Sequence, residues 1–166
     1  MVCFLLCFSG AALAGNPGSR APLVIEDDVG RTLTVTQPFT RIIPLYGAHT
    51  ENLFTLGAAD AVAGVTRHDS DLPAAQNKAV FSYHDGLERF LAAGPDLVLV
   101  RPMIDRGYAP LVQGLEKHGI PVLSLQPGTV EEMMAYWRTL GALSGRRMEA
   151  ERMIRAFRQA VADFPP

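Results

Sequence analysis

The sequence has almost no cysteine, since Cys3 and Cys7 are its only two and both lie in the first seven residues of 166. Residues 8–166 therefore use neither disulfides nor thiolate chemistry. An excess of charge of one sign is also lacking, because 15 Lys and Arg stand against 17 Asp and Glu, which gives a net charge of −2. This balance gives no electrostatic reason to expect nucleic acid or an anionic membrane as a partner.

Sequence patterns typical of enzymes are absent as well. The chain has no nucleophile elbow, no glycine loop for phosphate and no pair of carboxylates placed for acid–base chemistry. Asp27 and Asp28 fall in a predicted turn, and Glu131 and Glu132 fit the capping of a helix. We therefore predict no catalytic activity and no intrinsic cofactor.

Apolar residues gather at the N-terminus in a pattern typical of a secretory signal peptide. Residues 2–8 form its apolar core, and Ala12-Leu13-Ala14 supplies the cleavage pattern before Gly15. The apolar run is too short to span a bilayer, and the usual positively charged start is missing. We predict a signal peptide at 1–14, a flexible leader at 15–22 and export to the periplasm.

The stretch from Arg41 to Val65 predicts one crossover unit of a parallel sheet. The apolar run at 42–45 is long enough for a strand but too short for a buried helix. After a loop at 46–49, Thr50 is placed to cap a short helix that Gly57 ends. Residues 61–65 then predict a second strand. The loop at 46–49 thus follows a strand at its carboxyl end, where open α/β sheets bind ligands.

The rest of the chain repeats this alternation of strands and helices. Residues 23–26 and 32–35 predict a β-hairpin. Further strands are expected at 79–83, 96–100 and 120–125, with helices at 87–93 and 109–118. Together these patterns predict the α/β class, with a doubly wound, mostly parallel sheet flanked by helices.

Two longer helices close the sequence. Thr129 and Glu132 predict a capping box, and the helix that follows should turn Val130, Met133, Trp137 and Leu140 inward. From residue 146 to 164, a second helix carries an apolar stripe with spacings of three and four, which must pack on something.

Several motifs in register resemble a known family. These are Arg41-Ile42-Ile43-x-Leu45, the segment T-E-x-L-x-x-L-G-A-x-D-x-V-x-G-V at 50–65, Asp28-Val29-Gly30-Arg31, and Gly94-Pro95-Asp96-Leu97-Val98. The pattern resembles the class III periplasmic binding proteins, the substrate-binding components of ABC importers for ferric siderophores, haem and cobalamin. The resemblance implies a Rossmann-like N-terminal lobe at 23–145 and an interlobe helix at 146–166. The family's second lobe is absent from these 166 residues.

Four loops should gather at the carboxyl edge of the sheet: 46–49, 66–69, 82–85 with 101–108, and 126–129. Their aromatic side chains can cover apolar area, and their guanidinium groups can pair with carboxylate or catecholate oxygens. Solvated loop residues would show the same composition, so that alternative stays open. The candidate ligand-binding residues are Tyr46, His49, Arg67, His68, Tyr83, His84, Arg101 and Met103.

The histidines do not predict a dedicated metal site. His49, His68 and His84 lack the short helical spacing of metal ligands, and no carboxylate lies in a recognisable ligand motif. Axial contact of a His or Tyr to a haem iron stays open, because one ligand is enough there.

Two interpretations are open for Glu88. It can close a capping box with Asp85 at the start of the helix at 87–93. By resemblance, a glutamate at this place docks onto arginines of the membrane permease, which implies a permease dimer as partner and a location peripheral to the inner membrane. Glu51 is interpreted as structural, because it complements the dipole of its helix.

We therefore predict a periplasmic solute-binding lobe of an importer for an iron chelate or a corrinoid. The arginines favour an anionic iron chelate over cobalamin. The alternative from another class is a stand-alone α/β interaction module, left by truncation, that binds no ligand. A small enzyme of flavodoxin-like topology is a third interpretation, against which the missing phosphate loop argues.

Overall fold

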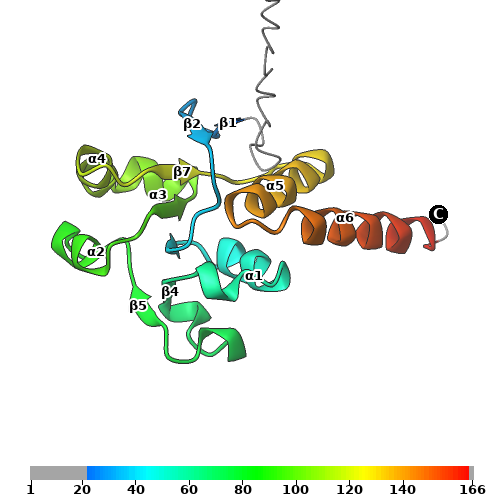
Figure 1. The fold of residues 1–166 in the computed structure, drawn as a ribbon, viewed down its shortest axis with the longest axis horizontal. Coiled ribbons are helices and arrows are strands. Elements are labelled where there is room, and N and C mark those ends of the chain that lie inside the picture. Colours follow the sequence, from blue (N-terminus) through cyan, green and yellow to red (C-terminus); the bar gives the residue numbers. More distant parts are fainter. Residues whose placement is uncertain (1–21, 165–166) are drawn as a thin grey trace, which may run out of the picture.

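The computed structural model describes residues 22–164, and parallel strands form its centre (Figure 1). Strand β3 (Ile42–Pro44) pairs with β6 (Leu97–Val100), which pairs with β7 (Val122–Ser124). Strand β4 (Gly64–Thr66) pairs with β5 (Ala79–Phe81), and a parallel bridge between Ile42 and Val62 joins the two groups. The strand order is therefore β5-β4-β3-β6-β7, and the predicted parallel sheet is confirmed.

Helices cover both faces of this sheet. One face carries α1 (Gly47–Thr55), α5 (Val130–Leu143) and α6 (Arg147–Ala162), and the other carries α2 (Leu87–Ala93), α3 (Pro102–Gly107) and α4 (Ala109–Lys117) (Figure 1). Successive strand residues alternate between the two: Leu97 and Leu99 join the first core, Val98 and Val100 the second. Because β6 is covered on both sides, all four of its residues are apolar and buried. The doubly wound α/β fold is thereby confirmed.

The predicted N-terminal hairpin is present as β1 (Leu23–Glu26) and β2 (Thr32–Val35), paired antiparallel. Asp27 in its turn accepts hydrogen bonds from the backbone N–H of Val29, Arg31 and Ser124. The Arg31 guanidinium then bridges Asp27 to Asp105 of α3 and Glu116 of α4. The hairpin is thus tied to β7 and to the helices that follow β6.

The segments Arg41-Ile42 and Gly94-Pro95-Asp96, which both belong to the family motifs, are hydrogen-bonded to each other. Asp96 accepts hydrogen bonds from the backbone N–H of Thr40 and of Arg41, both at 2.8 Å. In return, Arg41 Nε donates to the Gly94 carbonyl at the end of α2. Gly94 itself has a φ of 59°, which favours glycine and ends the helix as predicted. These hydrogen bonds hold the start of β3 beside the start of β6.

Helix α2 begins at Leu87 as predicted, but its cap and the starts of α1 and α3 differ from the sequence predictions. Helix α1 begins at Gly47 and not at Thr50, whose buried hydroxyl donates instead to Asp69. Helix α2 follows Gly86 without a side-chain cap, because the Asp85 carboxylate accepts from the Ser82 N–H instead. The predicted loop at 101–108 contains helix α3, which Pro102 opens at a position that needs no N–H.

The second strand of the first crossover is also shifted from its predicted place. A 3-10 turn at Ala59–Ala61 comes first, and β4 starts only at Gly64. A side chain at Gly64 would lie 2.4 Å from the Phe81 ring. Glycine there allows the close approach of β4 and β5.

The last two helices pack on each other. The capping box of Thr129 and Glu132 is confirmed, but Val130 is 49% exposed and does not point inward, whereas Met134 and Tyr136 are buried. On α6, Ala150 and Ile154 are buried, while Val161 near its end is 57% exposed. The stripe of α6 therefore has cover only over the first part of the helix.

None of the helices within residues 22–164 has the length and apolar character needed to cross a membrane. The predicted signal peptide at 1–14 lies outside the described residues, as does the predicted leader except for Pro22.

Candidate ligand-binding site

All five parallel strands end at the same edge of the sheet, and a residue of a predicted loop follows each of them. Tyr46 comes after β3, Arg67 directly after β4 and Tyr83 after β5. Arg101 directly follows β6, and Gln126 comes after β7. The structure therefore brings the predicted loops to one edge, the place where open parallel sheets bind ligands.

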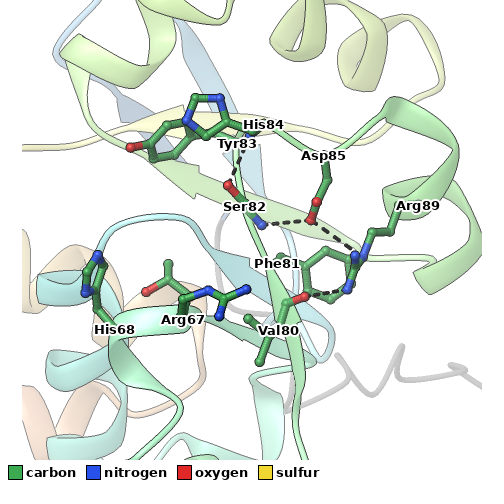
Figure 2. Close-up of a pocket in the computed structure, with 10 residues that line it drawn as sticks. Arg67, His68, Val80, Phe81, Ser82, Tyr83, His84, Asp85 and Arg89 are labelled. Atoms are coloured by element: carbon green, nitrogen blue, oxygen red, sulfur yellow. Dashed lines mark hydrogen bonds and ion pairs between the residues drawn. The ribbon is translucent and has the colours of Figure 1, made fainter.

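A cleft of about 350 Å³ lies at the ends of β4 and β5 (Figure 2). Its polar lining includes predicted and unpredicted residues: Thr66, Arg67, His68, Ser82, Tyr83, His84, Asp85 and Arg89. Arg67 and His68 are exposed, and within residues 22–164 their side chains make no hydrogen bond or ion pair. They are free to meet a ligand.

The opposite side of this cleft is held rigidly. The Asp85 carboxylate accepts from the Ser82 N–H at 2.9 Å and pairs with Arg89 at 3.5 Å. Arg89 also donates to the Val80 carbonyl, and its guanidinium carbon lies 5.3 Å from the centre of the Phe81 ring (Figure 2). Arg89 thus has structural partners, unlike Arg67.

Three aromatic rings meet at the rim of the cleft. Tyr83 packs on His84 and on Tyr108, with 4.6 Å between ring centres in both pairs. The Tyr108 hydroxyl lies 3.2 Å from both ring nitrogens of His84. Tyr108 lies in the predicted loop at 101–108 but was not among the candidate residues, and in the structure it directly follows α3.

Arg101 and Tyr46 form a stacked pair between the ends of β6 and β3. The guanidinium carbon of Arg101 lies 4.7 Å from the centre of the Tyr46 ring. Its Nη2 lies 3.4 Å from the sulfur of Met103, and its buried Nε has no hydrogen-bond partner. A buried donor without a partner is costly, so this guanidinium is placed to gain from an anionic or carbonyl-bearing ligand.

His49 differs from the other candidates, because it faces the interior. It is 1% exposed, and its Nε2 and Nδ1 lie 2.9 Å from the Val100 carbonyl and 2.7 Å from the Tyr136 hydroxyl. Burial lowers its pKa to about 4, against the smaller opposing effect of the Val100 carbonyl. With both ring nitrogens bonded inside the protein, His49 has no free nitrogen for a ligand, and its predicted contact is limited to the ring surface that lines the cavity between α1 and α5.

A second cavity, of about 260 Å³, opens between α1 and α5. It is lined by Tyr46, Ala48, His49, Asn52, Leu125, Gln126, Pro127, Met133, Tyr136 and Trp137. Sequence reasoning placed the loop at 126–129 at this edge but did not identify Asn52, Tyr136 or Trp137 as lining residues. These three lie within helices, and the contact of α1 with α5 alone brings them together.

Glu88 lies exposed in the first turn of α2 and makes no hydrogen bond or ion pair within the part of the chain that the structure describes. Because Gly86 precedes the helix and Asp85 is engaged elsewhere, the predicted capping box with Asp85 does not form. Within residues 22–164, no group of three His, Cys, Asp or Glu residues is placed to hold a metal ion.

The known proteins to which this chain is similar are of one kind. No protein-family model matches the chain. The protein YvrC of Bacillus subtilis (strain 168), an uncharacterized ABC transporter substrate-binding lipoprotein, is 25% identical over 146 residues. The match covers 86% of this chain and 46% of YvrC.

The solved structures to which this chain is similar are proteins of the same kind as YvrC. An ABC-type Fe3+-hydroxamate transport protein from Saccharomonospora viridis is 26% identical with a TM-score of 0.65, and the match covers 86% of this chain and 55% of that one. A periplasmic heme-binding protein from Pseudomonas aeruginosa is 24% identical with a TM-score of 0.64, and the match covers 72% and 43%. The chain thus spans about half the length of these relatives. The resemblance to periplasmic binding proteins is confirmed.

Proposed function

We propose that this chain forms the N-terminal lobe of a periplasmic solute-binding protein that delivers an anionic metal chelate to an ABC importer. The observation that carries the proposal is the row of cationic and aromatic side chains along the carboxyl edge of the sheet. The relatives' names mention Fe3+-hydroxamate and heme, which supports a chelated metal as cargo. The chain itself has no part in a chemical reaction.

In this proposal, different side chains contact different parts of the chelate. Arg67 and Arg101 pair with anionic oxygens of the chelate, since a planar guanidinium matches carboxylate and catecholate groups. Tyr46, Tyr83 and Met103 cover its apolar faces. His68 and His84 are exposed, and either can approach a metal centre that accepts one imidazole. His49 supports Tyr46 and lines the neighbouring cavity with its ring.

The domain boundaries and the location belong to the same proposal. Residues 1–14 are removed on export, 23–145 form the lobe, and the helix from 146 leads toward a second half like that of the relatives. Glu88 docks on an arginine of the permease, which its exposed, unpaired carboxylate supports. The stand-alone interaction module is not favoured, because YvrC is described as a substrate-binding component.

Replacement of Arg101 tests the function directly. We expect Arg101→Met to weaken binding of haemin or of a ferric trihydroxamate by about tenfold or more, because a charge-assisted hydrogen bond is lost and methionine keeps the apolar contact with Tyr46. The dissociation constant is measured by isothermal titration calorimetry. Arg106→Met, at an exposed arginine of the helix α3 that Arg101 precedes, is the matched control and should bind normally. Equal affinity of both variants contradicts the proposal.

A further inference from the structure

We propose that the cavity between α1 and α5 is a separate subsite that takes a neutral, largely apolar group of the ligand, such as an aromatic ring. Nothing in the relatives' names assigns this cavity a role. Its place in a chelate site rests on the proposed function, whereas its preference for neutral groups rests on its own walls.

The walls of the cavity carry no formal charge. Leu125, Pro127, Met133 and the Trp137 indole supply apolar surface. The one titratable ring with a pKa near neutrality in unfolded chains, His49, is neutral here because burial lowers its pKa to about 4. The cleft at β4 and β5, by contrast, is lined by two arginines and Asp85. A charged group would lose its hydration in the α1–α5 cavity without gaining a partner.

Most polar atoms around the cavity already have partners inside the protein. Trp137 Nε1 donates to Asn52 Oδ1 at 2.7 Å, and Asn52 Nδ2 donates to the Ala48 carbonyl at 2.6 Å. The Tyr136 hydroxyl is bonded to His49. An occupant therefore needs to form few hydrogen bonds with the walls, as expected for a subsite that holds apolar surface.

The size of the cavity fits one ring and not a whole chelate. A dry cavity of about 150 Å³ holds a benzene molecule, and this cavity has about 260 Å³. The volume lies below the range of about 300–1,000 Å³ that is usual for complete small-molecule sites.

Tyr46 connects the cavity with the cationic part of the edge. Its ring lines the cavity and also lies against the Arg101 guanidinium. A ligand that spans this boundary would place an anionic group at Arg101 and a neutral ring beside Trp137. The structure thus favours an asymmetric ligand, charged on one side and apolar on the other.

The test uses Trp137, the only tryptophan of the chain, whose indole N–H gives a single NMR signal. We expect benzamide, as a neutral aromatic probe, to shift this signal in the 166-residue protein, and benzoate to require at least tenfold higher concentration. Ala48→Leu, which adds bulk at a lining residue, should abolish the shift. Ala135→Leu is the matched control, since Ala135 is exposed on α5 and does not line this cavity.

A second variant, Met133→Ala, removes one apolar wall and should weaken benzamide binding several-fold even if Ala48→Leu fails to fold. No indole shift with benzamide, or an equal response to benzoate, overturns the inference whatever the chelates do. The proposed function fails separately, if benzamide binds but haemin and a ferric trihydroxamate do not. Support for both requires that Ala48→Leu also lowers affinity for one of these chelates, while Ala135→Leu does not.

Discussion

At the scale of single residues, His49 holds two parts of the site in place from inside the protein. The Val100 carbonyl can only accept a hydrogen bond, so Nε2 of the neutral ring donates to it and Nδ1 accepts from the Tyr136 hydroxyl. Val100 directly precedes Arg101, and the Tyr46 ring packs edge-on against His49 at 5.3 Å between ring centres. His49 therefore positions both members of the stacked pair.

This arrangement makes the stability of the protein depend on pH. The pKa of His49 is lowered from its ordinary value near 6.5 to about 4, so between these values the unfolded chain binds more protons than the folded protein. Stability is therefore fully present above pH 6.5 and falls as the pH drops toward 4. Between pH 7 and pH 5 we expect this histidine to account for a loss of about 2 kcal/mol.

Urea unfolding at the two pH values measures the effect. His49→Gln should be less stable at pH 7, and its stability should fall by about 2 kcal/mol less between pH 7 and pH 5 than that of the parent protein. His118→Gln, at an exposed histidine of the same chain, should keep the parent's pH dependence. If all three proteins lose stability equally, His49 is not neutralised by burial.

The sequence placed most site residues correctly because they follow strands. Tyr46, Arg67, Tyr83 and Arg101 come after apolar runs, and parallel strands present their carboxyl ends together. The direction of the His49 side chain could not be predicted, since it depends on Tyr136, which is 87 residues away in the chain. The cavity lined by Trp137 depends on the same kind of long-range packing, so it could not be predicted either.

At the scale of elements, the start of α2 determines what Glu88 can do. Asp85 accepts the Ser82 N–H and pairs with Arg89, and this leaves Glu88 exposed in the first turn without a partner in the described residues. A carboxylate there favours the helix through its dipole, an effect of about 0.3–1 kcal/mol. Its position leaves it free to meet an arginine of a permease.

We expect Glu88→Arg to weaken association with the cognate permease, because it replaces an attraction by a repulsion that can cost several kcal/mol across an interface. Ligand affinity should stay unchanged, and stability should fall by no more than about 1 kcal/mol. Reconstituted transport with the full-length protein measures the effect. Glu131→Arg, at another exposed first-turn glutamate, controls for the helix dipole. Normal transport by Glu88→Arg assigns Glu88 a structural role only.

Elements with a strong local signal were predictable, and elements set by distant contacts were not. Strand β6 is apolar throughout because both of its faces are covered, and glycines with positive φ end several helices, as Gly94 and Gly119 do. Helix α3 was missed because only Ile104 of its six residues is buried, which leaves no apolar period. Arg31, 74 residues before Asp105 in the chain, anchors this helix.

At the scale of the whole molecule, the doubly wound sheet supplies one wall of a binding site. Its carboxyl edge carries a cationic cleft, a stacked Arg101–Tyr46 pair and an uncharged cavity. The chain matches only about half the length of these relatives, so we propose that a second half covers the ligand in the whole protein. Small-molecule sites usually bury 70–90% of a drug-sized ligand, which one edge alone does not achieve.

NMR titration of the 166-residue protein with haemin, a ferric trihydroxamate and cyanocobalamin tests this account most directly. We expect at least one ferric chelate to broaden or shift the amide signals at residues 46, 67–68, 83–84 and 101–103, with a dissociation constant in the high-micromolar range, about −4 to −5.5 kcal/mol. Cyanocobalamin, which carries no net negative charge, should bind more weakly than haemin, whose propionate groups are anionic. Absence of any change at these residues, or changes confined to other parts of the protein, would contradict the account.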